Sequence, residues 1–326
     1  MPVTVTKTVK PSGGDYTSLS AWEAGEQADL VTADQIKQAE CYSMADTSGV
    51  FIDGWTTDAA RYIRVYTPAA ERHDGKYNTA KYRLEAAVAD YAAVLTLSED
   101  FIRIEGLQVK LSGAGDVGYR RGITSQPAAT SDIRIEECIV VDAGTGTAAR
   151  YGIDILQGKF YVYNNIVYDW KTNGISSRWY TAGTHYWYNN TVYGCGVGIE
   201  RSGDETVYLK NNLCNGNITD YTGTFTNATT NLSEDATSPN VALRNKVVIF
   251  VNEAGDDFHI DSTDTSAKDT GTDLSADADS AYDITKDIDG TTRSGAWDIG
   301  ADEFVETGPA AGQPYLKRLG GIMGVE

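Results

Sequence analysis

The amino-acid sequence predicts an all-β protein built as a right-handed parallel β-helix. Three observations predict this fold: a short alternating strand that recurs along the chain, a column of Gly-Ile pairs between the recurrences, and a composition rich in glycine (33) and tyrosine (20) but poor in methionine (3). Short strands joined by small polar turns give this profile, whereas a helical protein uses long periodic runs of Leu, Ala, Glu and Lys.

The recurring strand alternates apolar and polar residues and ends in a polar turn. It is found in the segments 101–107, 132–138, 160–165, 185–190 and 207–212. A repeat of two to three dozen residues is typical of a solenoid, in which each coil stacks on the next at a spacing of about 4.8 Å. Strand alternation places Ile102 and Ile104 toward the core and Tyr161 and Tyr163 on the opposite face.

Two further columns fix the register of the coils. Gly-Ile pairs recur at 122–123, 152–153, 174–175 and 198–199, which gives each coil at least three strand-like pieces with a glycine at a bend. Asn165, Asn190 and Asn212 occupy equivalent positions at a turn. We expect their amides to form an inward ladder that bonds to the neighbouring amides and to the turn backbone.

The N-terminal region, residues 1–60, is expected to form a cap and the entry to the solenoid, because terminal coils expose an apolar face and open strand edges. Tyr16, Leu19 and Trp22 follow helical spacing, so we predict a capping helix within residues 15–30. Residues 61–66 are expected to begin the stack, and residues 61–240 to form the coils.

Residues 241–305 are expected to form C-terminal coils or a cap, and this section is very acidic after Val251. Asp287 and Asp289 resemble half of a calcium loop, although the later ligands are missing. Asp287 and Asp289 are therefore the candidate calcium ligands. We predict no other cofactor for this chain.

The last section, residues 306–326, starts as a linker of small residues and ends in a segment that mixes apolar and basic side chains. It is too short to form its own core. We interpret it as a tail that docks on a partner protein. The residues expected to make the contact are Tyr315, Leu316, Arg318, Leu319, Ile322 and Met323.

The net charge of −19 indicates that the chain binds neither nucleic acid nor anionic lipid. A polyanionic polysaccharide would need a local basic groove set against this field.

The N-terminus has no apolar region typical of a signal peptide, and no stretch approaches 18 apolar residues. The four cysteines lie far apart, which favours buried thiols over a zinc site or disulfides.

Both ends of the chain resemble a known group. Residues 14–22 are similar to the entry segment of right-handed β-helix repeat proteins of the pectate-lyase-like superfamily, and residues 257–260, 287–290, Arg293 and 298–303 resemble its closing segment. The superfamily includes polysaccharide lyases, glycoside hydrolases, epimerases, adhesins and phage virion proteins, so the resemblance implies architecture more than activity. The Lys-Arg-Leu-Gly-Gly run at 317–321 is similar to tails of phage structural proteins.

The sharpest enzymatic hypothesis concerns Asp154 and Glu200. Both follow the Gly-Ile column two coils apart, with Ser176 between them, so their backbones are expected to be roughly 9.6 Å apart. Inverting glycosidases hold their two carboxylates about 6.5–9.5 Å apart. Arg178 and Arg201 are the nearby candidates for neutralising a sugar carboxylate. Alternatively, Asp154 and Glu200 have no catalytic role and are polar only because their strand positions face outward.

Aromatic side chains in three successive coils could stack on sugar rings. Trp170, Trp179 and Tyr180 fall in turn regions, so we predict them to be the surface carbohydrate-binding candidates, whereas Trp187 aligns with core positions.

Three functions follow, in order of preference. The first is a non-enzymatic phage virion protein, such as a head decoration, a fibre or a tail-associated β-helix, that is assembled in the host cytoplasm, contacts other virion proteins through its tail and touches surface glycans. We expect a homo-oligomer, for which the resemblance to virion β-helices suggests a trimer as one form. The second is a polysaccharide lyase or glycoside hydrolase. The third is a bacterial surface adhesin, and either alternative would reach the cell surface or medium by a non-Sec route.

Overall fold

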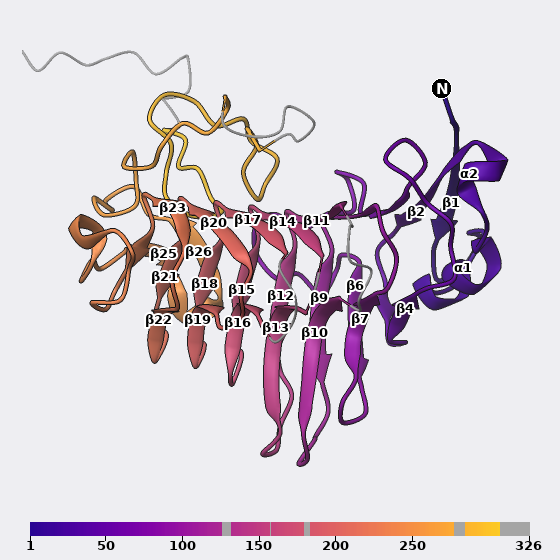
Figure 1. Ribbon diagram of the computed structural model, residues 1–326, viewed down its shortest axis with the longest axis horizontal. Helices are drawn as coiled ribbons and strands as arrows, with labels where there is room; N and C mark the ends of the chain where they lie inside the picture. Colours follow the sequence, from indigo (N-terminus) through magenta and orange to yellow (C-terminus); the bar gives the residue numbers. More distant parts are fainter. Residues whose placement is uncertain (126–131, 157, 179–182, 277–283, 307–326) are drawn as a thin grey trace, which may run out of the picture.

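The computed structural model describes residues 1–125, 132–156, 158–178, 183–276 and 284–306. In this part of the chain, short strands stack into three parallel sheets around one core, which confirms the predicted right-handed parallel β-helix (Figure 1). None of its helices has the length and hydropathy needed to cross a lipid bilayer.

Each sheet takes one strand from successive coils. The first sheet contains β1 (Val3–Val9), β2 (Gln35–Cys41), β5 (Ile63–Tyr66), β8 (Ile102–Glu105), β11 (Asp132–Glu136), β14 (Lys159–Tyr163), β17 (Thr184–Tyr188), β20 (Thr206–Lys210) and β23 (Thr226–Thr229). The second contains β3 (Ala45–Asp46), β6 (Arg83–Ala87), β9 (Gln108–Ser112), β12 (Ile139–Asp142), β15 (Ile166–Tyr168), β18 (Thr191–Tyr193), β21 (Leu213–Asn215) and β24 (Leu232–Ser233). The third contains β4 (Val50–Ile52), β7 (Ala93–Leu97), β10 (Tyr119–Ser125), β13 (Ala149–Ile155), β16 (Asn173–Ser177), β19 (Val197–Arg201) and β22 (Thr219–Thr222).

The register follows the predicted columns. In the first sheet Ile104 pairs with Ile135 and both are fully or almost fully buried, as alternation requires. In the third sheet the isoleucines of the Gly-Ile column stack on one another along β10, β13, β16 and β19. These apolar columns form a continuous core along the solenoid.

The asparagine ladder is confirmed and is longer than predicted. The backbone and side-chain N–H groups of Asn165 donate to Oδ1 of Asn190, at 3.1 and 3.0 Å, and Asn190 repeats this pattern on Asn212. Asn231 and Asn240 continue it. The ladder therefore gives the buried turn polar groups partners in coil after coil.

The residue before each ladder asparagine makes the corner between the first and second sheets. Asn164, Asn189 and Asn211 have φ angles of +53°, +52° and +53°. Asparagine tolerates this left-handed conformation better than most residues do. The repeated Asn-Asn pair thus combines a corner residue with an inward ladder residue.

The N-terminal cap is also confirmed. Helix α1 (Leu19–Glu26) starts at Ser18, whose hydroxyl accepts from the backbone N–H of Ala21, and α2 (Leu30–Ala33) follows it. Leu19, Trp22 and Leu30 are fully buried and close that end of the core. The stack begins earlier than residues 61–66, however, because β1 and β2 already pair in parallel register in the first sheet.

The C-terminal section lies against the side of the solenoid instead of extending the stack (Figure 1). It contains two short 3-10 helices, η1 (Val241–Leu243) and η2 (Glu253–Gly255), and one antiparallel pair, β25 (Phe250–Asn252) and β26 (Asp257–Ile260). Phe250 and Phe258 pack on the second sheet, and Trp297 packs on outward tyrosines of the first. Alternation predicted that these tyrosines face outward, but it did not predict what covers them.

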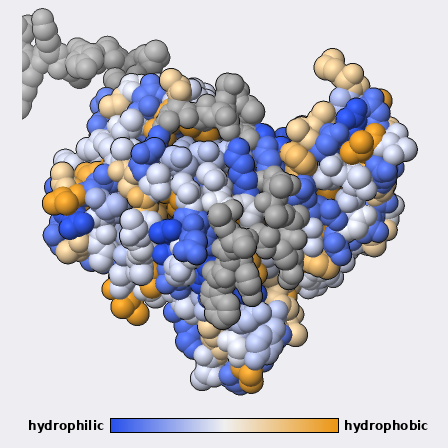
Figure 2. Space-filling view, viewed as in Figure 1, coloured by the Kyte–Doolittle hydropathy of each residue, from blue (hydrophilic) through white to orange (hydrophobic). Residues whose placement is uncertain are grey.

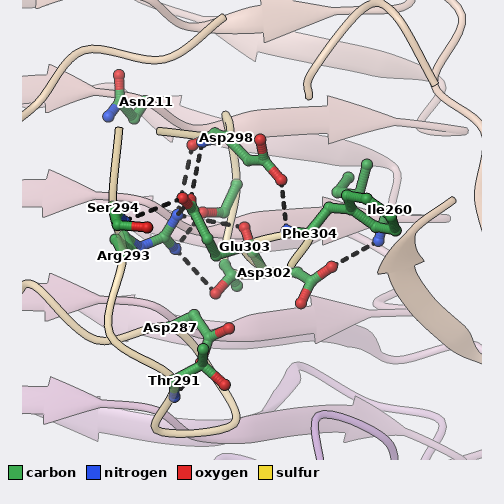
Figure 3. A network of polar contacts seen from close by, with 12 residues as sticks. Asn211, Ile260, Asp287, Thr291, Arg293, Ser294, Asp298, Asp302, Glu303 and Phe304 are labelled. Carbon is green, nitrogen blue, oxygen red and sulfur yellow. Dashed lines mark hydrogen bonds and ion pairs between the residues drawn. The ribbon is translucent and has the colours of Figure 1, made fainter. Parts of the chain in front are cut away.

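Arg293 anchors this section from a fully buried position (Figure 3). Its guanidinium donates to the carbonyl oxygens of Gly300 and Ala301, at 2.8 and 2.9 Å, and pairs with Glu303 at 3.2 Å. Asp298 accepts the backbone N–H of Phe304 in the same segment. These contacts give Arg293 and residues 298–303 a structural role in closing the fold.

All four cysteines are buried thiols, as predicted, and none is in a disulfide bond. Burial raises the pKa of Cys138 to about 12, so this thiol is inert near neutral pH.

Candidate functional site

A groove of about 870 Å³ lies on the outer face of the first sheet, over β5, β8 and β11. The chain after β5, at residues 67–73, forms one wall, and residues 286–290 of the C-terminal section form another. The outline in Figure 2 is hollowed in this region, between the C-terminal section and the N-terminal cap, and hydrophilic residues border the hollow. The groove is thus built by segments more than 200 residues apart in the sequence.

The floor of the groove consists of outward side chains from three adjacent coils. Parallel register stacks Arg64 on Arg103 and Arg103 on Arg134. One strand step away, Glu105 stacks on Glu136. The rigid strands therefore present a column of guanidinium groups beside a pair of carboxyl groups.

The charges of the groove are paired within it. Arg64 donates two hydrogen bonds to the carboxylate of Glu105, and Arg72 pairs with Glu137. Five cationic and four acidic side chains line the groove in a chain whose net charge is −19. The groove therefore carries one more cationic than acidic side chain, in contrast to the acidic chain as a whole.

Glu136 has the most perturbed carboxyl group of the floor. Burial raises its pKa to about 8, and the nearby Glu105 and Glu137 add to the effect. Burial also raises the pKa of Glu137, against the opposing effect of Arg72. At neutral pH Glu136 therefore holds a proton that it can donate.

His73 closes the end of the groove as a neutral side chain. Burial lowers its pKa to about 4. Its Nε2 lies 2.9 Å from the carbonyl oxygen of Glu137, and its Nδ1 accepts from the backbone N–H of Gly75 at 3.3 Å. These partners indicate the tautomer that carries its proton on Nε2.

The predicted pair Asp154 and Glu200 is in the expected register but not on an open face. Asp154 pairs with Ser176, and Ser176 with Glu200, in adjacent strands. Asp154 is fully buried, where Arg178 binds it through two hydrogen bonds of 2.9 and 2.6 Å and Arg121 binds it as well. This corrects the expectation of an accessible carboxylate, because two guanidinium groups cover the side chain.

The other residues of that hypothesis are also held by local contacts. Glu200 accepts a hydrogen bond from the side chain of Asn173. Arg178 stacks on the Tyr151 ring at 3.6 Å, and Arg201 donates to the carbonyl oxygens of Glu205 and Thr224. These contacts indicate a structural role for this column.

The surface position predicted for Trp170 is wrong. The side chain is fully buried, and its indole N–H donates to the carbonyl oxygen of Val140 at 3.0 Å. Glycines make the space: a Cβ at Gly122 or Gly152 would lie 2.9 or 3.0 Å from the Trp170 ring. Trp179 and Tyr180 lie outside the described residues, as do Tyr315, Leu316, Arg318, Leu319, Ile322 and Met323 of the tail.

Asp287 and Asp289 do not converge as two calcium ligands. Oδ1 of Asp287 accepts the backbone N–H groups of Asp289 and Thr291, which shapes its own turn. Asp289 instead lies 3.1 Å from Nε2 of His259. The residues present therefore fit an Asp-stabilised turn better than the calcium loop that the sequence suggested.

Comparison with known proteins adds no family assignment. No family model matches the chain, and no curated protein matches it. The three stacked parallel sheets identify a β-helix solenoid.

Sequence reasoning missed Glu105 and Glu136, although a signal was present. The run Ile-Arg-Ile-Glu occurs at 102–105 and again at 133–136, and alternation places its Arg and Glu outward in both coils. The groove walls gave no such signal, because they depend on contacts between distant loops.

Proposed function

We propose that the protein is a virion-associated β-helix of a phage that recognises an anionic glycan through the groove on its first sheet. The observation that supports this most is the groove itself, which is large enough for part of an oligosaccharide and carries more cationic than acidic side chains in an acidic protein. A chain that repels most polyanions would then admit one at a single place.

The groove offers the two kinds of contact that glycans use. Tyr62 and Tyr66 provide rings for the apolar faces of sugars, and the guanidinium groups of Arg103 and Arg64 lie 5.1 and 4.1 Å from these rings. Arginine binds a carboxylate or sulfate through two parallel hydrogen bonds. Because these side chains stand on paired strands, little reorganisation is needed on binding.

Support for a virion comes from sequence resemblance: the entry and closing segments resemble those of β-helix repeat proteins, and residues 317–321 are similar to phage structural tails. Detection of the chain in purified phage particles by mass spectrometry tests this part of the proposal, and its confinement to cell lysate after particle removal would contradict it.

We expect the double variant Arg64→Gln/Lys286→Gln to bind an anionic polysaccharide about tenfold more weakly than the parent chain, because each side chain supplies a partly exposed charge-assisted contact. The measurement is isothermal titration calorimetry with polygalacturonate, alginate and hyaluronan, and with neutral dextran for comparison. Binding should weaken as salt is raised.

The matched control is Lys171→Gln/Lys246→Gln, which removes the same charge from positions outside the groove. This control should bind like the parent chain. Equal losses in both double variants would show a general charge effect, and binding of dextran alone would contradict an anionic ligand.

Glycoside hydrolysis is a second candidate function, favoured by the pairing of Glu105 with Glu136 in adjacent coils. Adjacent strands lie about 4.8 Å apart, close to the roughly 5–5.5 Å between the carboxyl groups of retaining glycosidases. Glu136 would protonate the glycosidic oxygen, and the carboxylate of Glu105 would attack the anomeric carbon. Water would then release the sugar from Glu105, with Glu136 acting as the base.

If the groove hydrolyses its glycan, Glu136→Gln should lower kcat by about 10²–10⁴-fold, because glutamine keeps the shape of the neutral acid but cannot donate its proton to the leaving group. The parent activity should fall as the pH rises through about 8, where Glu136 loses its proton. Released reducing ends give the rate, and proton NMR of the first product gives its anomeric form.

Glu85→Gln is the control, since Glu85 pairs with Lys110 and Arg83 on the outer face of the second sheet. Retained activity in Glu136→Gln, or inversion at the anomeric carbon, would exclude this mechanism. Products that absorb in the near ultraviolet would indicate a lyase instead.

A further inference from the structure

Three side chains that could bind a metal ion meet beside the groove, although they are distant in sequence. His259 lies on β26, Asp289 on the turn at the groove wall and Asp302 in the closing segment. One ligand atom from each lies within 4.8 Å of the others. Bond lengths of about 2.1 Å in a tetrahedral zinc site place ligand atoms about 3.4 Å apart, so small side-chain movements suffice.

The imidazole is oriented as metal-binding histidines are. Nδ1 of His259 lies 2.5 Å from Oδ1 of Asp257, and Nε2 faces Asp289 at 3.1 Å. A carboxylate on one ring nitrogen fixes the tautomer and leaves the other nitrogen for the ion. Nζ of Lys76 lies 3.7 Å from Oδ2 of Asp257, the other oxygen of this carboxylate.

Asp302 provides independent evidence for a cation. Its side chain is more than nine-tenths buried, and its Oδ2 accepts the backbone N–H of Ile260 at 2.6 Å (Figure 3). Its other oxygen accepts no hydrogen bond from the described residues, and one oxygen of this carboxylate lies within 4.8 Å of the ligand atoms of His259 and Asp289. A buried carboxylate calls for a positive partner, which is either the imidazolium of His259 or an ion that replaces its proton.

The backbone of the loop after β5 covers the cluster. A Cβ at Gly75 would lie 2.4 Å from Nε2 of His259 and 2.5 Å from Oδ1 of Asp289. Gly75 also has a φ of +70°, so a side chain is disfavoured there for two reasons. A glycine at this position therefore keeps any side chain from colliding with the two ligand atoms.

We propose that His259, Asp289 and Asp302 bind one divalent transition metal ion of the zinc type at the edge of the groove. An imidazole nitrogen with two carboxylates suits zinc and similar first-row ions, whereas calcium prefers six to eight oxygen ligands. Three protein ligands leave a position for water. The ion would tie β26, the groove wall and the closing segment together, and this role does not depend on glycan binding.

The test is titration of the full chain, first dialysed against a chelator, with zinc chloride alone. We expect one ion per chain, calcium to compete poorly, and the thermal unfolding temperature to rise with bound zinc. His259→Gln and Asp302→Asn should each weaken zinc binding at least tenfold. The control Asp261→Asn, which changes a partly exposed carboxylate just beyond β26, should bind zinc like the parent chain.

A second measurement uses only the parent chain, so it does not depend on the folding of any variant. The protein has three histidines, of which His259 alone belongs to the cluster; His185 is buried elsewhere, and His73 is buried beside Gly75. Zinc should therefore shift the nitrogen-15 imidazole resonances of His259 more than those of His73 and His185. Absence of uptake, no shift in any histidine, or equal uptake by His259→Gln would overturn the proposal and leave His259 in a simple ion pair with its carboxylates.

Discussion

Replacing Arg293 with methionine is expected to destabilise the protein by about 3–5 kcal/mol, the usual cost of removing one partner of a buried ion pair. The Arg293 side chain is fully buried, and its loss removes the counter-ion of Glu303 and the guanidinium hydrogen bonds to the carbonyl oxygens of Gly300 and Ala301. Methionine fills similar space but cannot donate. The measurement is urea denaturation. The shift of the unfolding midpoint, at an unchanged dependence of the free energy on urea concentration, gives the change in the free energy of unfolding.

Arg83→Met is the matched control, because Arg83 pairs with Glu85 at a partly exposed site. Such a pair contributes about 0–1 kcal/mol. Limited proteolysis should cut the Arg293 variant first within residues 241–305, since that section depends on the anchor. Equal midpoints for the two variants would mean that Arg293 does not hold the closing segment.

The second large effect is expected for Asn190→Ala. This variant should lower the free energy of unfolding by about 3–5 kcal/mol, because it leaves several buried polar groups without partners at about 1–3 kcal/mol each. The change removes the acceptor of two Asn165 N–H groups and the donor to the carbonyl oxygen of Val162. No water can replace these contacts inside the turn, where Asn165 and Asn190 are fully buried. Chemical denaturation again gives the free energy.

Asn240→Ala provides the comparison at the end of the same ladder. Asn240 is partly exposed, so water can reach the N–H groups of Asn231 that it leaves behind. Its cost should be clearly smaller than that of Asn190→Ala. Similar costs at both positions would show that the inner amides are not protected as the ladder requires.

The features predicted from sequence are those set by local periodicity. The ladder at Asn165, Asn190 and Asn212 and the Gly-Ile column recur once per coil, so stacking follows from the pattern alone. Capping by Leu19 and Trp22 follows from helical spacing. Each of these features can be predicted once the residue periodicity and the length of one coil are known.

The features that were missed depend on contacts between distant segments. Trp170 is buried because Gly122 and Gly152 leave room for its ring, which no turn pattern reveals. Asp154 is buried because Arg121 and Arg178 close over it from neighbouring coils. The groove likewise exists because residues 286–290 lie beside β5, β8 and β11. Their position depends on the C-terminal section that Arg293 anchors.

The most direct test of the proposed function is a hydrogen–deuterium exchange map of the chain with and without a saturating anionic glycan. The account predicts slower exchange at residues 62–73, 102–105, 132–137 and 286–290, which contribute the lining of the groove, and no change in the third sheet. Protection confined to β10, β13 and β16, or no protection despite measured binding, would contradict the claim that this groove is the binding site.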